Sequence, residues 1–419
     1  MSRPGTAALR HRDFRFFLAS LLTTGLALQM SAVAIGWQVY DIHRHPLDLG
    51  LIGLAEFIPL PLLALPAGQL GDRVPRRTML ALATVLDVAV SVGLLAVTIG
   101  GARQLWAFVA LATGTGIASA LGAPSGRALT PSLVPPEILS DALALRSIAF
   151  QVAGVLGPAL GGVLFFIRPE LVYGVAAGLS LASVASVCAL RSGRDAATSD
   201  ASGLESVFAG ISLIRRTPVL LGAISLDLFA VLLGGAVALL PVFARQVLHV
   251  GPVGLGVLRA APAVGAFVAA VLLVRRPIGR LAGRKMLGVV AAFGACMVVF
   301  GLSRSMWLSL AALAVGGGVD LVSVVLRSTI LPLVTPDELR GRVNAVEMVF
   351  ISASNELGAF ESGVAAALIG AIPAVVVGGV ATIVIAAAWT RLFPALANVD
   401  RLEDLRPVYA SPALTSPDS

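Results

Sequence analysis

Residues 127–139 read RALTPSLVPPEIL and residues 327–339 read RSTILPLVTPDEL, so one pattern occurs twice at a separation of 200 residues. The identical positions of the first copy are Arg127, Leu133, Val134, Pro136 and Leu139. A pattern that returns at this spacing indicates two halves that share one fold. Each copy joins the fourth apolar run of its half to the fifth, which predicts six membrane helices in each half.

The composition around this repeat is that of a membrane protein. Of 419 residues, 57% are hydrophobic and 13% are charged, whereas soluble domains have about 45–50% apolar and about 25% charged residues. A soluble domain, a coiled coil and a disordered chain are therefore excluded, and the lipid bilayer is an expected partner. The two cysteines, Cys188 and Cys296, lie inside apolar runs and offer neither a disulfide framework nor a metal site.

Twelve charge-poor runs have the length of about 20 residues that a helix needs to cross a bilayer. They cover about 14–40, 49–71, 78–100, 104–126, 142–167, 171–190, 218–244, 251–274, 286–303, 305–326, 342–369 and 373–390. Gly370 and Pro373 favour a turn between the last two runs. The predicted fold class is an all-α membrane protein with twelve transmembrane helices in two pseudo-symmetric six-helix bundles.

The predicted domains follow from these runs. Residues 1–190 form the first bundle, 191–217 a linker with an amphipathic helix, 218–393 the second bundle and 394–419 a polar tail that we expect to be poorly ordered. The net charge of +7 comes from Lys and Arg in short loops, which favours a membrane topology signal over nucleic acid binding. Their placement predicts that both termini and the linker are cytoplasmic.

The loop GQLGDRVPRR, residues 68–77, combines several residues that suit a helix–helix corner. Gly68 allows two helices to approach closely, and Asp72 can pair with an arginine or a helix N-terminus. The arginines of the loop can anchor it to anionic lipid, and they are Arg73, Arg76 and Arg77. The alternative is a positively charged cytoplasmic loop without a further role.

This loop resembles the signature G-x-L-x-D-R-x-G-R-R of the major facilitator superfamily, with Pro75 in place of the second glycine. The corresponding loop of the second half, RRPIGRLAGRKM, has Arg280 where Asp72 would stand. The stretch from WQVYD to PRR and the segment PSLVPPEIL resemble the enterobactin-exporter-like branch of bacterial carriers. The resemblance implies alternating access between two six-helix lobes around a central cavity.

The fifth run contains GPALGG, residues 157–162. Gly157 and Gly161 form a small-xxx-small surface and Pro158 can kink the helix, with Gly162 extending that surface. The segment partly resembles the antiporter signature of the superfamily, although Ala153 replaces one of its glycines. Close helix packing without a transport role is the alternative.

Acidic residues inside the runs are the sharpest functional signals, because a charge at mid-bilayer costs about 2.5–3.5 kcal/mol or more. The candidate substrate and proton residues are Asp227, Asp320, Glu56, Glu356 and Glu361. The resemblance places the helices of Asp227 and Asp320 along the central cavity. The alternative is a packing residue held permanently by an ion pair, and we favour this alternative for Asp87.

Basic residues in or beside the runs have simpler expected roles. Arg127 and Arg327, related by the repeat, are expected to close the inner gate by pairing with acids. Arg146 and Arg259 could bind an anionic substrate. Because both lie near helix ends, we favour the alternative that their charged groups extend toward the membrane surface.

Motifs for ATP hydrolysis (GxxxxGK[ST]), zinc proteases (HExxH) and serine hydrolases (GxSxG) do not occur in the sequence. We therefore expect no enzyme and no cofactor. The sequence predicts a monomeric secondary transporter in the bacterial inner membrane that exports a small organic solute, siderophore-like or drug-like, in exchange for protons. Proton-coupled metabolite uptake and a non-transporting membrane receptor or assembly factor are the alternatives.

Overall fold

The computed structural model describes residues 7–63, 74–191, 204–276 and 279–407, and this part of the chain is helical without a strand. The helices of the first half are α1 (Arg12–His43), α2 (Pro46–Phe57), α4 (Arg76–Ile99), α5 (Leu105–Ser132), α6 (Leu139–Ile167) and α7 (Pro169–Cys188). The span that begins with α2 runs Pro46–Leu63. Short 3-10 turns precede α1 and α6 at Ala7–Arg10 and Pro136–Ile138.

The second half follows a linker helix, α8 (Leu204–Arg216). Its long helices are α9 (Pro218–Gly234), α11 (Pro252–Arg275), α12 (Ala282–Leu302), α13 (Met306–Val334), α14 (Arg340–Ile369) and α15 (Ala371–Leu392). Shorter elements are η3 (Ala236–Leu239), α10 (Leu240–Val242), the π-helical turn η4 (Phe243–Val247), η5 (Asp337–Leu339), α16 (Pro394–Ala397) and η6 (Leu402–Asp404). Two sets of six long helices agree with the twelve predicted runs.

Eleven helices of the described chain are long and apolar enough to cross a membrane. The twelfth, α14, is 30 residues long but carries two arginines in its first turn and three glutamates along its length. Its charges are accommodated because α14 packs on other helices. Gly358 meets the backbone of α9 at Leu232, and Gly363 meets α2 at Gly50.

The seventh span is not the continuous helix that the apolar run 218–244 predicts. α9 ends at Gly234, and the chain continues through a 3-10 turn, a short α-helical turn and the π-turn up to Val247. Pro241 explains part of this break, because it has no N–H to donate and its ring clashes with the carbonyl four residues earlier. By contrast, the turn predicted at Gly370 is present, with Gly370 at φ 89° between α14 and α15.

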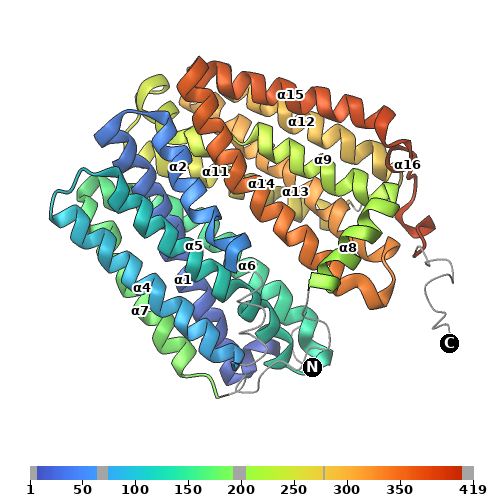
Figure 1. Ribbon diagram of the computed structural model, residues 1–419, viewed down its shortest axis with the longest axis horizontal. Coiled ribbons are helices and arrows are strands. Elements are labelled where there is room, and N and C mark those ends of the chain that lie inside the picture. The colour runs from blue at the N-terminus through green and yellow to red at the C-terminus, as the bar shows by residue number, and fades with distance from the viewer. Residues whose placement is uncertain (1–6, 64–73, 192–203, 277–278, 408–419) are drawn as a thin grey trace.

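Figure 1 shows the helices of the first half (blue to green) beside those of the second half (yellow to red), close together near α2 and α11 and further apart near the N-terminus and α8. We call the end where α1 ends and α2 begins the far end. The opposite end, where α1 begins and where Arg76 and Arg77 lie, is the basic end.

Buried apolar clusters in the described residues differ between these ends. The far-end cluster combines residues from both halves, with Trp37 and Tyr40 of α1 beside Phe243 and Leu255 of the second half. The two clusters at the basic end each belong to one half, one around Phe14 and Phe17 and the other around residues of α9, α12 and α13. Among the described residues, the buried apolar cluster that combines both halves is therefore the one at the far end.

The linker and the beginning of the tail pack on the second half. In α8, Leu213 and Ile214 are buried, and Gly210 lies against the backbone of Arg342 in α14. The expectation of a poorly ordered tail is wrong for residues 394–407, because Leu396 and Val399 are buried and the backbone carbonyl of Val399 accepts a hydrogen bond from Gly283 at 3.0 Å.

Candidate functional site

A cavity of about 230 Å³ lies where the two halves meet. Helices α1, α4, α5 and α7 of the first half line it together with Glu56 of the second span, and the second half contributes Arg259 from α11 and Glu356 from α14. Three carboxylates and one guanidinium thus share one cavity with several hydroxyl groups. Such a polar cavity inside a helical membrane protein is typical of a substrate or ion path.

Glycines position Glu56 and Glu356 at the junction of the halves. A Cβ atom at Gly53 would lie 2.9 Å from the Cβ of Ala359 and 3.6 Å from a carboxylate oxygen of Glu356. A Cβ atom at Gly116 of α5 would collide with the backbone carbonyl of Glu56. Because both positions lack a side chain, α5 and α14 approach the second span closely on either side of Glu56.

Arg259 lies within electrostatic range of both Glu56 and Glu356. The side chain of Arg259 is half-buried and faces the cavity instead of reaching toward the membrane surface as expected. The two nearby carboxylates lie on other helices, one of them in the other half, and the sequence gives no sign of this proximity. Among the described residues no direct ion-pair contact fixes Arg259 to either glutamate.

Asp87 of α4 also lines the cavity, with 9% of its surface exposed. The sequence favoured a packing role for it, in which a partner would hold the carboxylate. Within the described chain, Asp87 has neither a hydrogen bond nor an ion pair.

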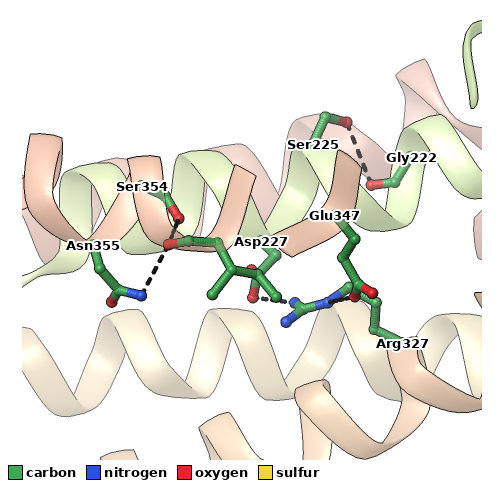
Figure 2. A network of polar contacts seen from close by, with 8 residues as sticks. Gly222, Ser225, Asp227, Arg327, Glu347, Ser354 and Asn355 are labelled. Atoms are coloured by element: carbon green, nitrogen blue, oxygen red, sulfur yellow. Dashed lines mark hydrogen bonds and ion pairs between the residues drawn. The ribbon is translucent and has the colours of Figure 1, made fainter. Parts of the chain in front are cut away.

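Asp227 occupies a different site, in an ion network at the basic end of the second half (Figure 2). Arg327 of α13 forms an ion pair with Asp227 of α9, and its Nε donates a hydrogen bond of 3.0 Å to Glu347 of α14. The exposed fraction of Arg327 is 3% and that of Asp227 is 7%. The network therefore joins three helices of one half and lies apart from the residues that line the cavity.

The other two predicted acids also lie outside the cavity lining. Asp320 of α13 is half-buried and within electrostatic range of Asp227 and Arg327. Glu361 of α14 is half-buried. Of the five acids that the sequence singled out, the structure brings Glu56 and Glu356 together in one cavity, places Asp227 and Asp320 around Arg327, and leaves Glu361 apart.

The signature loop is described only in part. Gly68, Asp72 and Arg73 lie outside the described residues. Arg76 donates a hydrogen bond of 3.1 Å to the backbone carbonyl of Ala128, which connects α4 to α5. Arg77 donates hydrogen bonds to the last carbonyls of α7, at 2.6 Å to Cys188. Both arginines thus hold helix ends together, as suits a cation at a helix C-terminus.

The repeat-related arginines have different surroundings. Arg127 is exposed, and no ion pair of its side chain is found in the described part of the chain. The like-charged Arg146 lies within electrostatic range of it, and the Nη1 of Arg146 donates a hydrogen bond of 3.3 Å to the hydroxyl of Thr130. The acids that pair with Arg327 lie in its own half, so the role of either arginine in a gate remains a prediction.

The small residues of α6 lie on two packing surfaces. A Cβ atom at Gly157 would lie 2.5 Å from the Cβ of Gln29, and one at Gly161 would lie 2.9 Å from the backbone of Met30, both in α1. Gly162 and Pro158 instead face α11 of the other half, where a Cβ at Gly162 would lie 2.5 Å from the carbonyl of Pro252.

Sequence reasoning missed the contact that links the halves by charge at the far end. Asp41 of α1 forms an ion pair of 2.5 Å with Arg245 of η4, and the Arg245 guanidinium lies 5.4 Å from the centre of the Trp37 ring. A cation over an aromatic ring adds to this attraction. Asp41 and Arg245 are 204 residues apart and lie in different halves, so no local spacing could have connected them.

A charged contact also holds the tail at the basic end. The backbone N–H of Leu281 donates a hydrogen bond of 2.9 Å to Asp400, and Arg280 lies 3.3 Å from the same carboxylate. The hydrogen bond from Leu281 and the neighbouring Arg280 lower the pKa of Asp400 below its ordinary value of 3.8. Arg280, which replaces an acid of the signature in the second half, therefore binds an acid from the tail.

Two six-helix halves, sealed at one end around a polar cavity, define a helical membrane transporter of the major facilitator type. The chain belongs to the transmembrane secretion effector family, whose model matches residues 4–414. It is a multi-pass membrane protein, and the relatives and structural neighbours described next are transporters and not enzymes.

Curated relatives include the enterobactin exporter EntS of Citrobacter koseri, 26% identical over 88% of this chain and 90% of the relative. The enterobactin exporter of Escherichia coli O139:H28 is 26% identical over 80% of this chain and 81% of its own. The fold matches a bacterial homologue of the lysosomal transporter Spinster, inward-facing and unoccupied, with a TM-score of 0.71 at 16% identity over 94% and 99% of the chains. A bacterial homologue of ferroportin gives a TM-score of 0.68 at 17% identity over 92% and 99%.

Proposed function

We propose that this transporter exports a small organic solute across the bacterial inner membrane in exchange for protons. The observation that carries the proposal is the cavity between the halves, with carboxylates from both of them. In the described part of the chain, the buried apolar cluster shared by the two halves lies at the far end. A solute that enters from the basic end reaches this cavity, and rocking of the halves exposes it at the far end. The exporter relatives support outward transport.

In this proposal the basic end faces the cytoplasm and both termini lie inside. The arginines at this end, with Arg76 and Arg77 on helix ends, are consistent with the tendency of cytoplasmic loops to be basic. The closed far end then faces outward. For export to occur, the Asp41–Arg245 contact must break while the basic ends of the two halves come together.

Glu56 and Glu356 are the acids that we propose as proton carriers, because they face the solute cavity from opposite halves. A carboxylate that binds a proton when the cavity opens outward and releases it inward couples solute export to the proton gradient. Asp227 and Asp320 we assign to the Arg327 network, which holds α9, α13 and α14 together as one moving unit. The loop residues Gly68, Asp72 and Arg73 are proposed to support the corresponding corner of the first half.

The test is transport by purified protein in proteoliposomes that contain a pH-sensitive dye. A panel of compounds, with enterobactin and organic cations included, is offered under an imposed pH gradient. We expect solute movement against the proton flow, with coupled pH change lost in Glu56→Gln and Glu356→Gln and retained in Glu361→Gln, which removes a carboxylate from the same helix outside the cavity. Solute flux that ignores the gradient contradicts antiport, and flux in the direction of the protons indicates uptake.

A further inference from the structure

Asp87 is the cavity carboxylate whose charge the described residues leave uncompensated. It is nine-tenths buried, lines the cavity and makes no hydrogen bond or ion pair with a described residue. Glu56 and Glu356, by contrast, both lie within electrostatic range of Arg259. An isolated ionised carboxylate away from water is strongly unfavourable. Packing within the described chain gives no reason for an acid at this position. We therefore attribute the acid to a group that the cavity binds.

The charged side chains of the cavity favour a bound solute with a positive charge over one with a negative charge. Among the described residues, three carboxylates and a single guanidinium line the cavity, and two of the carboxylates lie within electrostatic range of that guanidinium. An anionic solute would therefore meet an arginine whose charge two nearby carboxylates already offset, and it would be repelled by Asp87. A cationic group placed beside Asp87 would balance the remaining negative charge. Electrostatic interactions at such a partly dehydrated site are strong.

The remaining lining indicates what the rest of the solute is like. Hydroxyl groups of Ser91, Thr115 and Ser119 lie around the cavity, next to the apolar side chains of Ile35 and Leu94. Hydroxyls can accept hydrogen bonds from an ammonium or amidinium group, and the apolar walls suit an aromatic or aliphatic body. The volume of about 230 Å³ fits the charged part of a compact organic molecule.

We propose that the cavity binds the positively charged group of an organic cation, with Asp87 of α4 as its counter-ion. This inference rests on the proposed export function and narrows its solute from a small organic compound to a drug-like cation. Asp87 is then a specificity-determining residue, retained for the solute at the expense of stability in the empty protein.

The experiment measures binding without any gradient, so its outcome is independent of whether transport is proton-coupled. Purified full-length protein in nanodiscs of zwitterionic lipid is dialysed against radiolabelled benzylammonium or benzenesulfonate, a cation and an anion of similar size, with empty nanodiscs subtracted. The variants are Asp87→Asn, which removes the charge at constant shape, and Asp87→Glu, which keeps it. Glu361→Gln is the matched control, because it removes a half-buried carboxylate outside the cavity.

We expect the wild type to bind the cation at least about tenfold more tightly than the anion, and Asp87→Asn to lose about tenfold or more in cation affinity. Asp87→Glu and Glu361→Gln should retain the preference for the cation. Without ligand, Asp87→Asn should melt at the same or a higher temperature than the wild type, because it removes an unpaired buried charge.

Two results would overturn the proposal. One is a wild type that does not bind the cation more tightly than the anion. This result does not depend on whether any variant folds. The other is cation binding by Asp87→Asn equal to that of the wild type. A melting temperature of Asp87→Asn well below that of Asp87→Glu would show that the carboxylate serves packing instead. Failure of proton coupling in proteoliposomes, with cation binding intact, would count against antiport alone.

Discussion

The two ends of the molecule are held by different kinds of contact. At the far end, charge and apolar contacts cross between the halves, with Asp41 bound to Arg245 and a mixed cluster around Trp37 and Phe243. At the basic end, the Arg327 network lies entirely within the second half, and its repeat-related counterpart Arg127 has no acidic partner among the described residues. Contacts within a half stabilise a rigid unit, whereas contacts between halves set which conformation is populated.

Removing Arg327 should have the largest effect, and the effect should be on stability. Arg327→Ala leaves Asp227 and Glu347 buried without their cation, and breaking a buried pair in this way costs about 3–5 kcal/mol. The matched variant is Arg127→Ala at the equivalent, exposed position, where we expect about 0.5 kcal/mol or less. Thermal unfolding of the purified proteins measures both. Equal destabilisation by the two substitutions would contradict the conclusion that Arg327, unlike Arg127, neutralises buried acids.

A side chain at Gly162 should separate the halves where α6 packs on α11. Gly162→Leu places atoms where the Pro252 carbonyl of α11 now lies, and backbone cannot yield as a flexible side chain can. Overpacking of this kind costs about 1–3 kcal/mol. Gly174→Leu in α7 is the control, since nothing lies within 4 Å of a Cβ there. Thermal unfolding and the distance between spin labels on α6 and α11 measure the effect. If Gly162→Leu changes neither the melting temperature nor this distance, the result argues against this contact.

Removing the charge pair at the far end should change conformation more than stability. The Asp41–Arg245 pair is partly exposed, so we expect about 0.2–1 kcal/mol from Asp41→Asn or Arg245→Gln. At the upper value the ratio of far-end-open to far-end-closed molecules rises about fivefold. Arg44→Gln, which alters a contact to Asp41 inside one half, is the control. Spin-label distances across the far end report the change, and a wild-type distribution in Arg245→Gln would count against it.

The tail contact should depend on pH with a small effect. Because the pKa of Asp400 is lowered in the folded protein, its contribution is fully present above the ordinary value of 3.8 and is lost as pH falls through the lower folded value. Proteolysis of the tail should therefore be unchanged between pH 7 and pH 5 in the wild type. Asp400→Asn should accelerate cleavage after residue 393 at pH 7, while Glu403→Gln should not. Equal cleavage of all three proteins would show that Asp400 does not hold the tail.

Local sequence signals were sufficient to predict the helices and several of their boundaries. Long apolar runs predicted twelve helices, and Gly370 marked the turn between the last two, because hydrophobic length and glycine conformation are properties of a short segment. The break between Gly234 and Val247 was missed although Pro241 was visible, since a continuous apolar run outweighed one proline. The packed part of the tail was missed because two buried residues, Leu396 and Val399, stand in a polar segment.

The site was predictable only where one residue was unusual by itself. Intramembrane acids were recognised, and Glu56 and Glu356 do share the cavity. Which acids are paired depends on residues far away in sequence. The partner of Asp227 and the lack of a described partner for Asp87 could therefore be identified only from the structure. Arg259 was misjudged for the same reason, because its two carboxylates lie on other helices.

The most direct test of alternating access is a pair of distances measured in one set of samples. Spin labels at the exposed positions 103 and 304 report the far end, and labels at Glu137 and Glu338 report the basic end, after Cys188 and Cys296 are replaced by serine. As conditions change from neutral to acidic pH or a transported solute is added, we expect one distance to lengthen while the other shortens. Two distances that stay fixed, or that change in the same direction, would contradict the account.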